Sequence, residues 1–367
     1  MDRILFDQKE VDGKTESMGM FGPAITFDYP VSPKENYRLL YEGKTPYWFP
    51  GFGDMQMMTP RIDPDNTARA FSFEAQPFPP DEWVGGPDKF GTEWVYVPVA
   101  QGSMVVPGNP TMTNTNDWQD LINFPDVAKW DWAGSAEANK DWVKTDKWFV
   151  FSHLSGLFER LISFMDFENA AVALIDPDQK KATLALLDAI ADTTIDIAGR
   201  AFDAYGGFDT FNMHDDWGAQ AGPFFSEAVC MEMIVPSLKK IIDFTHNELG
   251  IYYDMHSCGK NELLVPCYIA AGVDSWMGQP MNDKKMLYDK YGDKIILGIE
   301  PDLPFDFFNP DPSITLEDTC ASAQRFIDMY LPNFQEKPVT MGFFGGPPGY
   351  DEWFYEASRK AFDAVAW

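Results

Sequence analysis

A histidine and a cysteine two residues apart form the motif with the clearest chemical meaning. They are His256 and Cys258, in the run His256-Ser257-Cys258-Gly259 at the end of an apolar segment. Residues two apart on a strand point to the same side, so an imidazole and a thiolate at this spacing can hold one metal ion. Zinc suits a mixed nitrogen and sulfur set best, and Gly259 lets the chain turn away. The alternative is a buried cysteine beside an ordinary histidine at a strand end.

A second group of polar residues follows another apolar segment, in the run His214-Asp215-Asp216-Trp217-Gly218-Ala219-Gln220. Two adjacent acids at a strand end can bind substrate, orient a water molecule or transfer a proton. We therefore predict catalytic roles for His214, Asp215 and Asp216. An aspartate that caps the next helix explains the pair equally well. Trp217 is either a packing residue or a wall of the substrate pocket.

The elements that must position these residues are short apolar runs that alternate with helix-like stretches. The runs are nearly continuous, as is typical of parallel strands buried on both faces. They are WFVFSHL (148–154), FDTFNMHDD (208–216), IYYDMHSC (251–258), VDSWMG (273–278), IILGIE (295–300) and VTMGFF (339–344), with TPYWFPGF (45–52) and TEWVYVPVA (92–100) as two further strands. Eight strands alternating with helices predict an α/β fold. We expect a single (β/α)8 TIM-type barrel over 46–367 and a helical extension over 1–45.

The clearest predicted helices lie between these strands. One covers 175–201, with Asp176 as the cap and Pro177 at the first helical position. Another carries the apolar stripe of Leu238 and Ile241, and ends at Gly250. In a barrel the side chains at the carboxyl ends of the strands meet at one mouth. We therefore expect His214, Asp216, His256, Cys258 and Glu300 to surround that mouth.

Composition and charge exclude several classes of protein. The chain has 367 residues, 45% of them hydrophobic, which is too apolar for a disordered protein. Its net charge of −29 disfavours binding to nucleic acid or to an anionic membrane. No apolar run approaches the roughly 18 residues of a membrane helix, and the first residues lack the order of a secretion signal. Four cysteines are too few for a disulfide framework, so we expect a cytoplasmic protein.

The order of motifs over 209–279 resembles the uroporphyrinogen decarboxylase-like superfamily. The matching pieces are the strand-end Asp-Asp-x-Gly, a proline midway along the next helix, a helix-ending Leu-Gly, the His-x-Cys-Gly and a Gly-Val-Asp before the next strand end. The similarity extends weakly from about Asn36 to Gly349. It implies the barrel fold and a site at the strand ends.

The branches of that superfamily differ in chemistry. Its decarboxylases carry an arginine- and glycine-rich loop after the first strand, whereas YWFPGFGDMQM (47–57) contains no arginine. The carboxylates of a porphyrinogen would have no arginine partners in this loop, and the net charge of −29 would repel them. We therefore reject decarboxylation. The resemblance instead implies a zinc-dependent, corrinoid-linked methyltransferase in which His256 and Cys258 are ligands. The position of the family's third ligand, a cysteine before Pro347-Pro348-Gly349, is Phe344 here. Glu300 and Gln279 are the candidate replacements, and Glu300 is preferred because carboxylates are ordinary zinc ligands.

The predicted reaction moves a methyl group from a small-molecule donor, such as a methoxylated aromatic, to cobalt. The cobalt belongs to a corrinoid (cobalamin) carried by a partner corrinoid protein, and the reaction would be an O-demethylation. A site with one nitrogen, one sulfur and one oxygen ligand suits activation of an ether oxygen. We predict that the substrate is bound by Trp48, Phe52, Trp217, Gln220 and Gln279. The alternatives are transfer from methyl-cobalt to a small thiol, and a metal-free barrel that only binds a small molecule. A second copy of this chain, in a homo-oligomer, is left open as a further partner.

Overall fold

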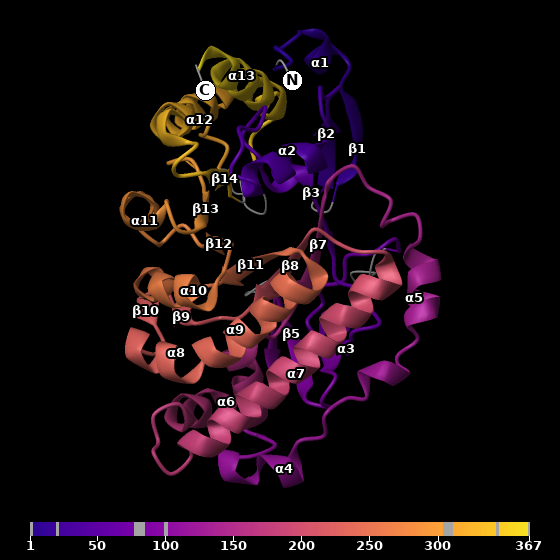
Figure 1. Cartoon of the computed structure of the whole chain (residues 1–367), viewed down its shortest axis with the longest axis vertical. Coiled ribbons are helices and arrows are strands. Elements are labelled where there is room, and N and C mark those ends of the chain that lie inside the picture. The colour runs from indigo at the N-terminus through magenta and orange to yellow at the C-terminus, as the bar shows by residue number, and fades with distance from the viewer. Residues whose placement is uncertain are drawn as a thin grey trace. The chain divides into compact units, whose positions relative to one another are not determined.

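The chain forms two compact units in the computed structural model, which describes residues 3–19, 22–76, 85–98, 102–303, 311–342 and 345–365 (Figure 1). The larger unit comprises Met57–Lys144 and Phe149–Asn282. The smaller unit comprises Met1–Gln56, Thr145–Trp148 and Asp283–Trp367. The predicted boundary between residues 45 and 46 therefore falls inside the smaller unit.

Four parallel strands form the centre of the larger unit. They pair in the order β7, β8, β11 and β12, and their bounds are Trp148–His153, Thr210–His214, Tyr252–Ser257 and Ser275–Gly278. Each lies within a run predicted from the sequence. Along β11 the residues that alternate with the site-facing set, Tyr253 and Met255, are fully buried. The strand is therefore packed on that face, while Asp254 and His256 share the other.

Helices connect these parallel strands, as parallel pairing requires. Their bounds are α6 Leu157–Ala173, α7 Lys180–Tyr205, α8 Glu227–Met233, α9 Val235–Phe244 and α10 Val265–Ala271, with a π-helical turn η6 at Thr245–Leu249 and a 3-10 turn η7 at Glu262–Leu264. The long helix α7 lies beside α9 (Figure 1). Gly250 ends the helical stretch with a φ of 67°, as predicted. Helix α7 begins later than predicted because Asp176 accepts from Asp178 N in a separate turn.

The rest of the larger unit is a small antiparallel sheet with short helices. Its elements are β4 Gly85–Pro87, β5 Glu93–Val97, β6 Gly102–Val105, α3 Pro64–Ala68, α4 Trp118–Leu121, α5 Trp132–Asn139, the two-residue strands β9 Gly218–Ala219 and β10 Gly222–Pro223, and the 3-10 turns η4 Thr115–Asp117 and η5 Val127–Lys129. Strand β5 pairs antiparallel with both β4 and β6. The prediction of 92–100 as a barrel strand is therefore wrong within its described part. Antiparallel hairpins need only short connections, and the apolar pattern does not reveal strand direction.

The smaller unit contains the last two predicted strands and the N-terminal residues. Its elements are α1 Lys9–Asp12, β1 Thr15–Gly19, β2 Gly22–Thr26, α2 Pro33–Tyr41, η1 Phe52–Asp54, α11 Lys284–Tyr291, β13 Ile296–Ile299, α12 Leu316–Tyr330, η8 Leu331–Asn333, β14 Val339–Met341 and α13 Tyr350–Ala364. Strand β3 (Met55–Met58) spans the boundary of the units. Strands β13 and β14 pair in parallel.

Two predictions for the smaller unit need correction. The run 45–52 is not a strand, since only Gly51 forms a bridge, in parallel with Met341. The N-terminal extension is not purely helical, because β1 and β2 form an antiparallel hairpin. Prolines at positions 46 and 50 remove two strand donors from the predicted run.

The architecture is an α/β fold built on parallel strands that alternate with helices. Closure into an eight-stranded barrel stays a prediction. Within the described residues, none of the helices is long and apolar enough to cross a membrane. Cytoplasmic localisation stays a prediction as well.

Candidate metal centre

The candidate site is built on the carboxyl ends of the neighbouring strands β8 and β11. Their register places His214 opposite His256, with the ring centroids 5.3 Å apart and the rings nearly parallel at 15°. Cys258 follows β11, and Gly259 then turns the chain with a φ of 85°. A Cβ at that glycine would lie 2.2 Å from the carbonyl oxygen of Gly218. The expectation that Gly259 lets the chain turn away is therefore supported by sterics.

Three side chains of types that can bind a metal meet at this point. The Cys258 Sγ lies 3.7 Å from His214 Nε2 and 3.6 Å from His256 Nε2. All three potential ligand atoms lie within 4.8 Å of one another. The histidine and cysteine selected from the sequence are thus joined by His214, for which the sequence analysis predicted a catalytic role.

The spacing of these atoms fits a tetrahedral zinc ion. With bonds of about 2.0 Å to nitrogen and about 2.3 Å to sulfur, tetrahedral geometry separates adjacent N and S ligands by about 3.5 Å. The two observed N–S distances, 3.6 and 3.7 Å, are close to that value. Two imidazoles and one thiolate would also leave one position open, which is the pattern of catalytic zinc sites.

Glu159 contacts His214 at Nδ1, and Arg69 in turn bonds to Glu159. The Glu159 Oε2 lies 3.0 Å from His214 Nδ1, so it can accept the Nδ1–H and leave the Nε2 lone pair for a metal. Arg69 Nη1 donates to Glu159 Oε1 at 2.9 Å and to Ser155 Oγ at 3.0 Å. The arrangement is therefore a chain from guanidinium to carboxylate to imidazole.

The charges in this chain determine the pKa values at the site. Burial opposes ionisation of Glu159, but Arg69 and His214 outweigh it and lower the pKa of the carboxyl to about 2. Burial also opposes the charged form of His214, yet the carboxylates of Glu159 and Asp216 raise its pKa well above the ordinary value. Burial raises the pKa of the Cys258 thiol, and His214 partly offsets this rise. A metal ion would therefore displace protons from both ligands.

The two adjacent aspartates point to different structural tasks. Asp216 accepts from Cys258 N at 2.8 Å, and its Oδ1 lies 3.2 Å from His214 Nε2. Asp215 is fully buried and accepts from the backbone N–H groups of Phe158 and Glu159 at 3.0 and 2.8 Å. It therefore caps the first turn of α6, a helix that precedes it in the sequence.

Two further contacts surround the side chain of Asp215. The indole of Trp217 donates to Asp215 at 2.8 Å, and a Cβ on Gly156 would lie 2.4 Å from the Asp215 Cβ. Burial, followed by the charge of Glu159, raises the pKa of Asp215 to about 7. The catalytic assignments of His214, Asp215 and Asp216 stay predictions.

The predicted substrate-binding residues of the larger unit lie near the cluster in sequence but differ in exposure. Trp217 is fully buried and stacks on Tyr268 at 4.8 Å, so it packs the core. Gln220 is exposed in the turn between β9 and β10. Gln279 accepts from Gly259 N at 2.6 Å and so supports the turn after Cys258. Their roles in substrate binding stay predictions.

The remaining predicted site residues belong to the smaller unit. Trp48 is buried and donates from its indole to Asp54 at 3.0 Å, and Phe52 begins the 3-10 turn η1. Glu300 follows β13, and its Oε2 lies 3.4 Å from Lys284 Nζ. Its proposed bond to the metal stays a prediction, and the carboxylate already has a cationic partner. Phe344 lies outside the described residues.

Sequence reasoning missed Glu159 and Arg69. Glu159 lies in the first turn of α6 and Arg69 follows α3, so neither is near a strand-end motif. Charged residues at such positions are normally solvated, and the sequence carries no signal that separates them from others. Only the packing of α3 near α6 brings them to His214.

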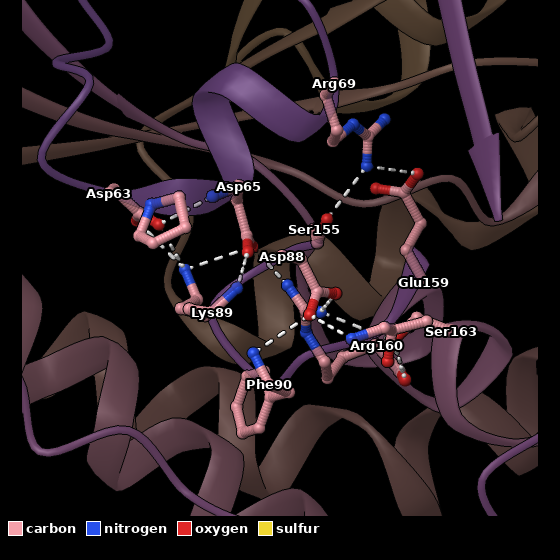
Figure 2. A network of polar contacts seen from close by, with 12 residues as sticks. Asp63, Asp65, Arg69, Asp88, Lys89, Phe90, Ser155, Glu159, Arg160 and Ser163 are labelled. Carbon is pink, nitrogen blue, oxygen red and sulfur yellow. Dashed lines mark hydrogen bonds and ion pairs between the residues drawn. The ribbon is translucent and has the colours of Figure 1, made fainter. Parts of the chain in front are cut away.

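That packing depends on a buried cluster of charges (Figure 2). Arg160 of α6 bonds to Asp65 of α3 and, at 2.5 Å, to Asp88. Lys89 bonds to Asp63 at 2.9 Å and to Asp65 at 3.0 Å. Each of these buried charges has an opposite charge beside it, as burial requires.

Comparison with known proteins identifies a shared fold. No protein-family model matches the sequence, and no curated protein matches it. Among solved structures, a methyltransferase from Methanosarcina mazei is similar with a TM-score of 0.59, over 91% of this chain and 98% of that one. The two sequences are 13% identical. At that identity the likeness shows a common fold.

Proposed function

We propose that the protein is a zinc-dependent methyltransferase that moves a methyl group from a small donor to the cobalt of a corrinoid carried by a separate protein. The observation that carries this proposal is the meeting of His214, His256 and Cys258 at a spacing that fits zinc. The similarity in fold to a methyltransferase supports it at a coarser level. The sequence resemblance to the corrinoid-linked branch of the uroporphyrinogen decarboxylase-like superfamily supports the choice of acceptor.

In this proposal, the chain's own residues hold the metal and shape its surroundings. His256 and Cys258 supply ligands from one strand end, and His214 supplies the third from its neighbour. Glu159 accepts the Nδ1–H of His214 and so directs Nε2 toward the other ligands. Bound zinc would act as a Lewis acid on the oxygen of the departing group.

Asp216 lies beside the proposed zinc site, where its carboxyl group can transfer a proton. Its side chain is 31% exposed, which leaves room for a substrate or a water molecule next to it. Its Oδ1 is already oriented by the Cys258 N–H. A carboxyl group that is protonated at this position can give its proton to the leaving oxygen as the methyl group departs, a contribution worth about 10²–10⁴-fold in rate.

The charges around the cluster favour a neutral methyl donor over a carboxylated one. Glu159 and Asp216 place carboxylates on both nitrogen sides of His214. Arg69 is a cation beside this group, and its guanidinium is already bonded to Glu159 and Ser155. The net charge of −29 adds a field that repels anions at long range. We therefore expect guaiacol to be a better donor than its carboxylated analogue vanillate.

A methyl-transfer assay with cob(I)alamin as the acceptor tests the proposal. The zinc-loaded protein and guaiacol should produce methylcobalamin, which is followed by its absorbance, and His256→Ala should abolish the reaction. His246→Gln is the matched control because His246 pairs with Asp274 away from the strand-end motif. Methylation of a small thiol by methylcobalamin, without the forward reaction, would favour the thiol alternative. Failure of the protein to bind zinc would refute the proposed centre.

A further inference from the structure

Arg69 is held beside the cluster of His214, His256 and Cys258 by three separate groups. Its guanidinium bonds to Glu159 and Ser155 and stacks on the ring of Trp94 at 4.9 Å. Figure 2 shows Nη1 turned toward both Ser155 and Glu159. With its side chain only 12% exposed, Arg69 is a buried part of this arrangement and does not extend into solvent.

The partners of Arg69 are themselves fixed. Ser155 adopts a φ of 61°, a conformation that residues other than glycine rarely take and that tends to occur at functional sites. It lies in the connection between β7 and α6, where Gly156 N donates to His214 O at 2.8 Å. Arg69 therefore bonds to the connection between β7 and α6, and this connection also donates a hydrogen bond to the backbone of His214.

The buried charge cluster fixes the helix that carries Glu159. Arg160, the next residue in α6, bonds to Asp65 of α3 and to Asp88 (Figure 2). Arg69 directly follows α3. The bond between Arg160 and Asp65 therefore holds α3 and α6 at the separation that lets Arg69 reach Glu159.

We propose that Arg69 is a positioning residue of the metal centre: by holding Glu159, it keeps the imidazole of His214 oriented with Nε2 toward Cys258. The inference rests on the proposed zinc site. Glu159 has one oxygen, Oε1, for Arg69 and the other, Oε2, for His214 Nδ1. Removal of the guanidinium would free the carboxylate to rotate away from the imidazole. The ring would then lose the contact that selects which nitrogen faces the metal.

Zinc affinity, measured by competition with a chromophoric chelator, tests the inference without an activity assay. We expect Arg69→Met to weaken zinc binding by about 10–100-fold, the usual effect of losing an outer partner of a metal-bound histidine. Glu159→Gln should weaken it to a similar extent, and the double variant should be little weaker than either single one, because both act through one contact. Arg69→Lys should restore part of the affinity, since an ammonium can pair with Glu159 but cannot also fork to Ser155.

Arg61→Met is the matched control. Arg61 pairs with Glu74 at 2.5 Å in the same unit, and neither belongs to the ligand cluster. This variant should bind zinc as tightly as the parent. Cobalt(II) substitution adds a second readout, since the ligand-field spectrum of Arg69→Met should depart from the tetrahedral pattern while that of Arg61→Met should match the parent.

A folded Arg69→Met protein with parental zinc affinity and cobalt spectrum would overturn the inference. If that variant does not fold, Arg69→Leu, which also has no donor for Glu159, makes the same measurement, and parental affinity there would also overturn it. If the double variant loses zinc affinity by the sum of the two single losses, Arg69 and Glu159 do not act through one contact, and the inference is wrong. If the parent binds no zinc, or if His214→Ala binds it normally, the proposed metal centre itself is wrong. Both results are distinguishable from a failure of the Arg69 inference alone.

Discussion

A buried carboxyl group on β11, the strand that carries His256, gives a stability prediction whose size follows from the structure. Asp254 lies in the middle of β11, two residues before His256. It accepts from Asn212 Nδ2 at 2.6 Å and from Ser275 Oγ at 2.5 Å, on the two neighbouring strands. Asn212 in turn accepts from Ser152 Oγ at 2.7 Å. These four residues share one register position, so they form a polar row across the sheet.

Desolvation raises the pKa of Asp254 from its ordinary 3.8 to about 6. The folded protein therefore holds this proton more tightly than the unfolded chain does. The contribution of the group to stability is complete below pH 3.8 and is lost as the pH rises through about 6. At about 1.4 kcal/mol per pKa unit, ionisation costs about 1 kcal/mol near pH 4.5 and about 3 kcal/mol near pH 7.5.

Asp254→Asn removes this ionisation and can keep the polar row, because the Ser275 hydroxyl is able to accept from the new amide. The free energy of unfolding of the variant relative to the parent should therefore increase by about 2 kcal/mol between about pH 4.5 and about pH 7.5. Urea unfolding followed by tryptophan fluorescence at the two pH values measures this change. A constant offset from altered hydrogen bonds does not affect it.

Asp203→Asn is the control for this measurement. Asp203 is exposed in α7, and its side chain is solvated in both the folded and unfolded chain. Its substitution should give a difference in stability that does not vary with pH. If the stability difference for Asp254→Asn is also independent of pH, burial does not raise the pKa of Asp254 and the prediction is wrong.

Three further predictions concern the candidate site. Zinc affinity should fall steeply as the pH drops below neutrality, because binding displaces protons from Cys258 and His214, whose pKa values are both raised; Cys258→Ser should reduce the affinity at every pH, and parental affinity would show that the thiolate is not a ligand. Asp216→Asn should slow demethylation of donors with poor leaving groups and spare donors whose phenolate is stable, as measured by methylcobalamin formation; an equal loss for both, with a lower melting temperature, would indicate a structural role. Gly156→Ala should lower stability by about 1–3 kcal/mol, since its Cβ would lie 2.4 Å from the Asp215 Cβ and disrupt the cap of α6, and an unchanged melting temperature would contradict this contact.

The sequence by itself determined six of the strands and the place of His256 and Cys258 at the end of one of them. The continuous apolar runs predicted β7, β8, β11, β12, β13 and β14, because strands buried on both faces must be apolar throughout. The spacing of His256 and Cys258 predicted that both side chains would lie on one side, since a strand repeats every two residues. The same local reasoning failed for 45–52 and 92–100, where apolar and aromatic residues pack without forming parallel strands.

Tertiary structure decided which third side chain completes the cluster and what supports it. His214 is far from Cys258 in sequence, and only the pairing of β8 with β11 brings its Nε2 to 3.7 Å from the sulfur. The cap formed by Asp215 joins two separate segments, so a search for caps along the chain would not find it. Glu159 and Arg69 are placed by the packing of α6 near α3. Local periodicity encodes an element and its faces, whereas contacts between distant elements depend on the whole fold, and the contacts that surround His214 are of this second kind.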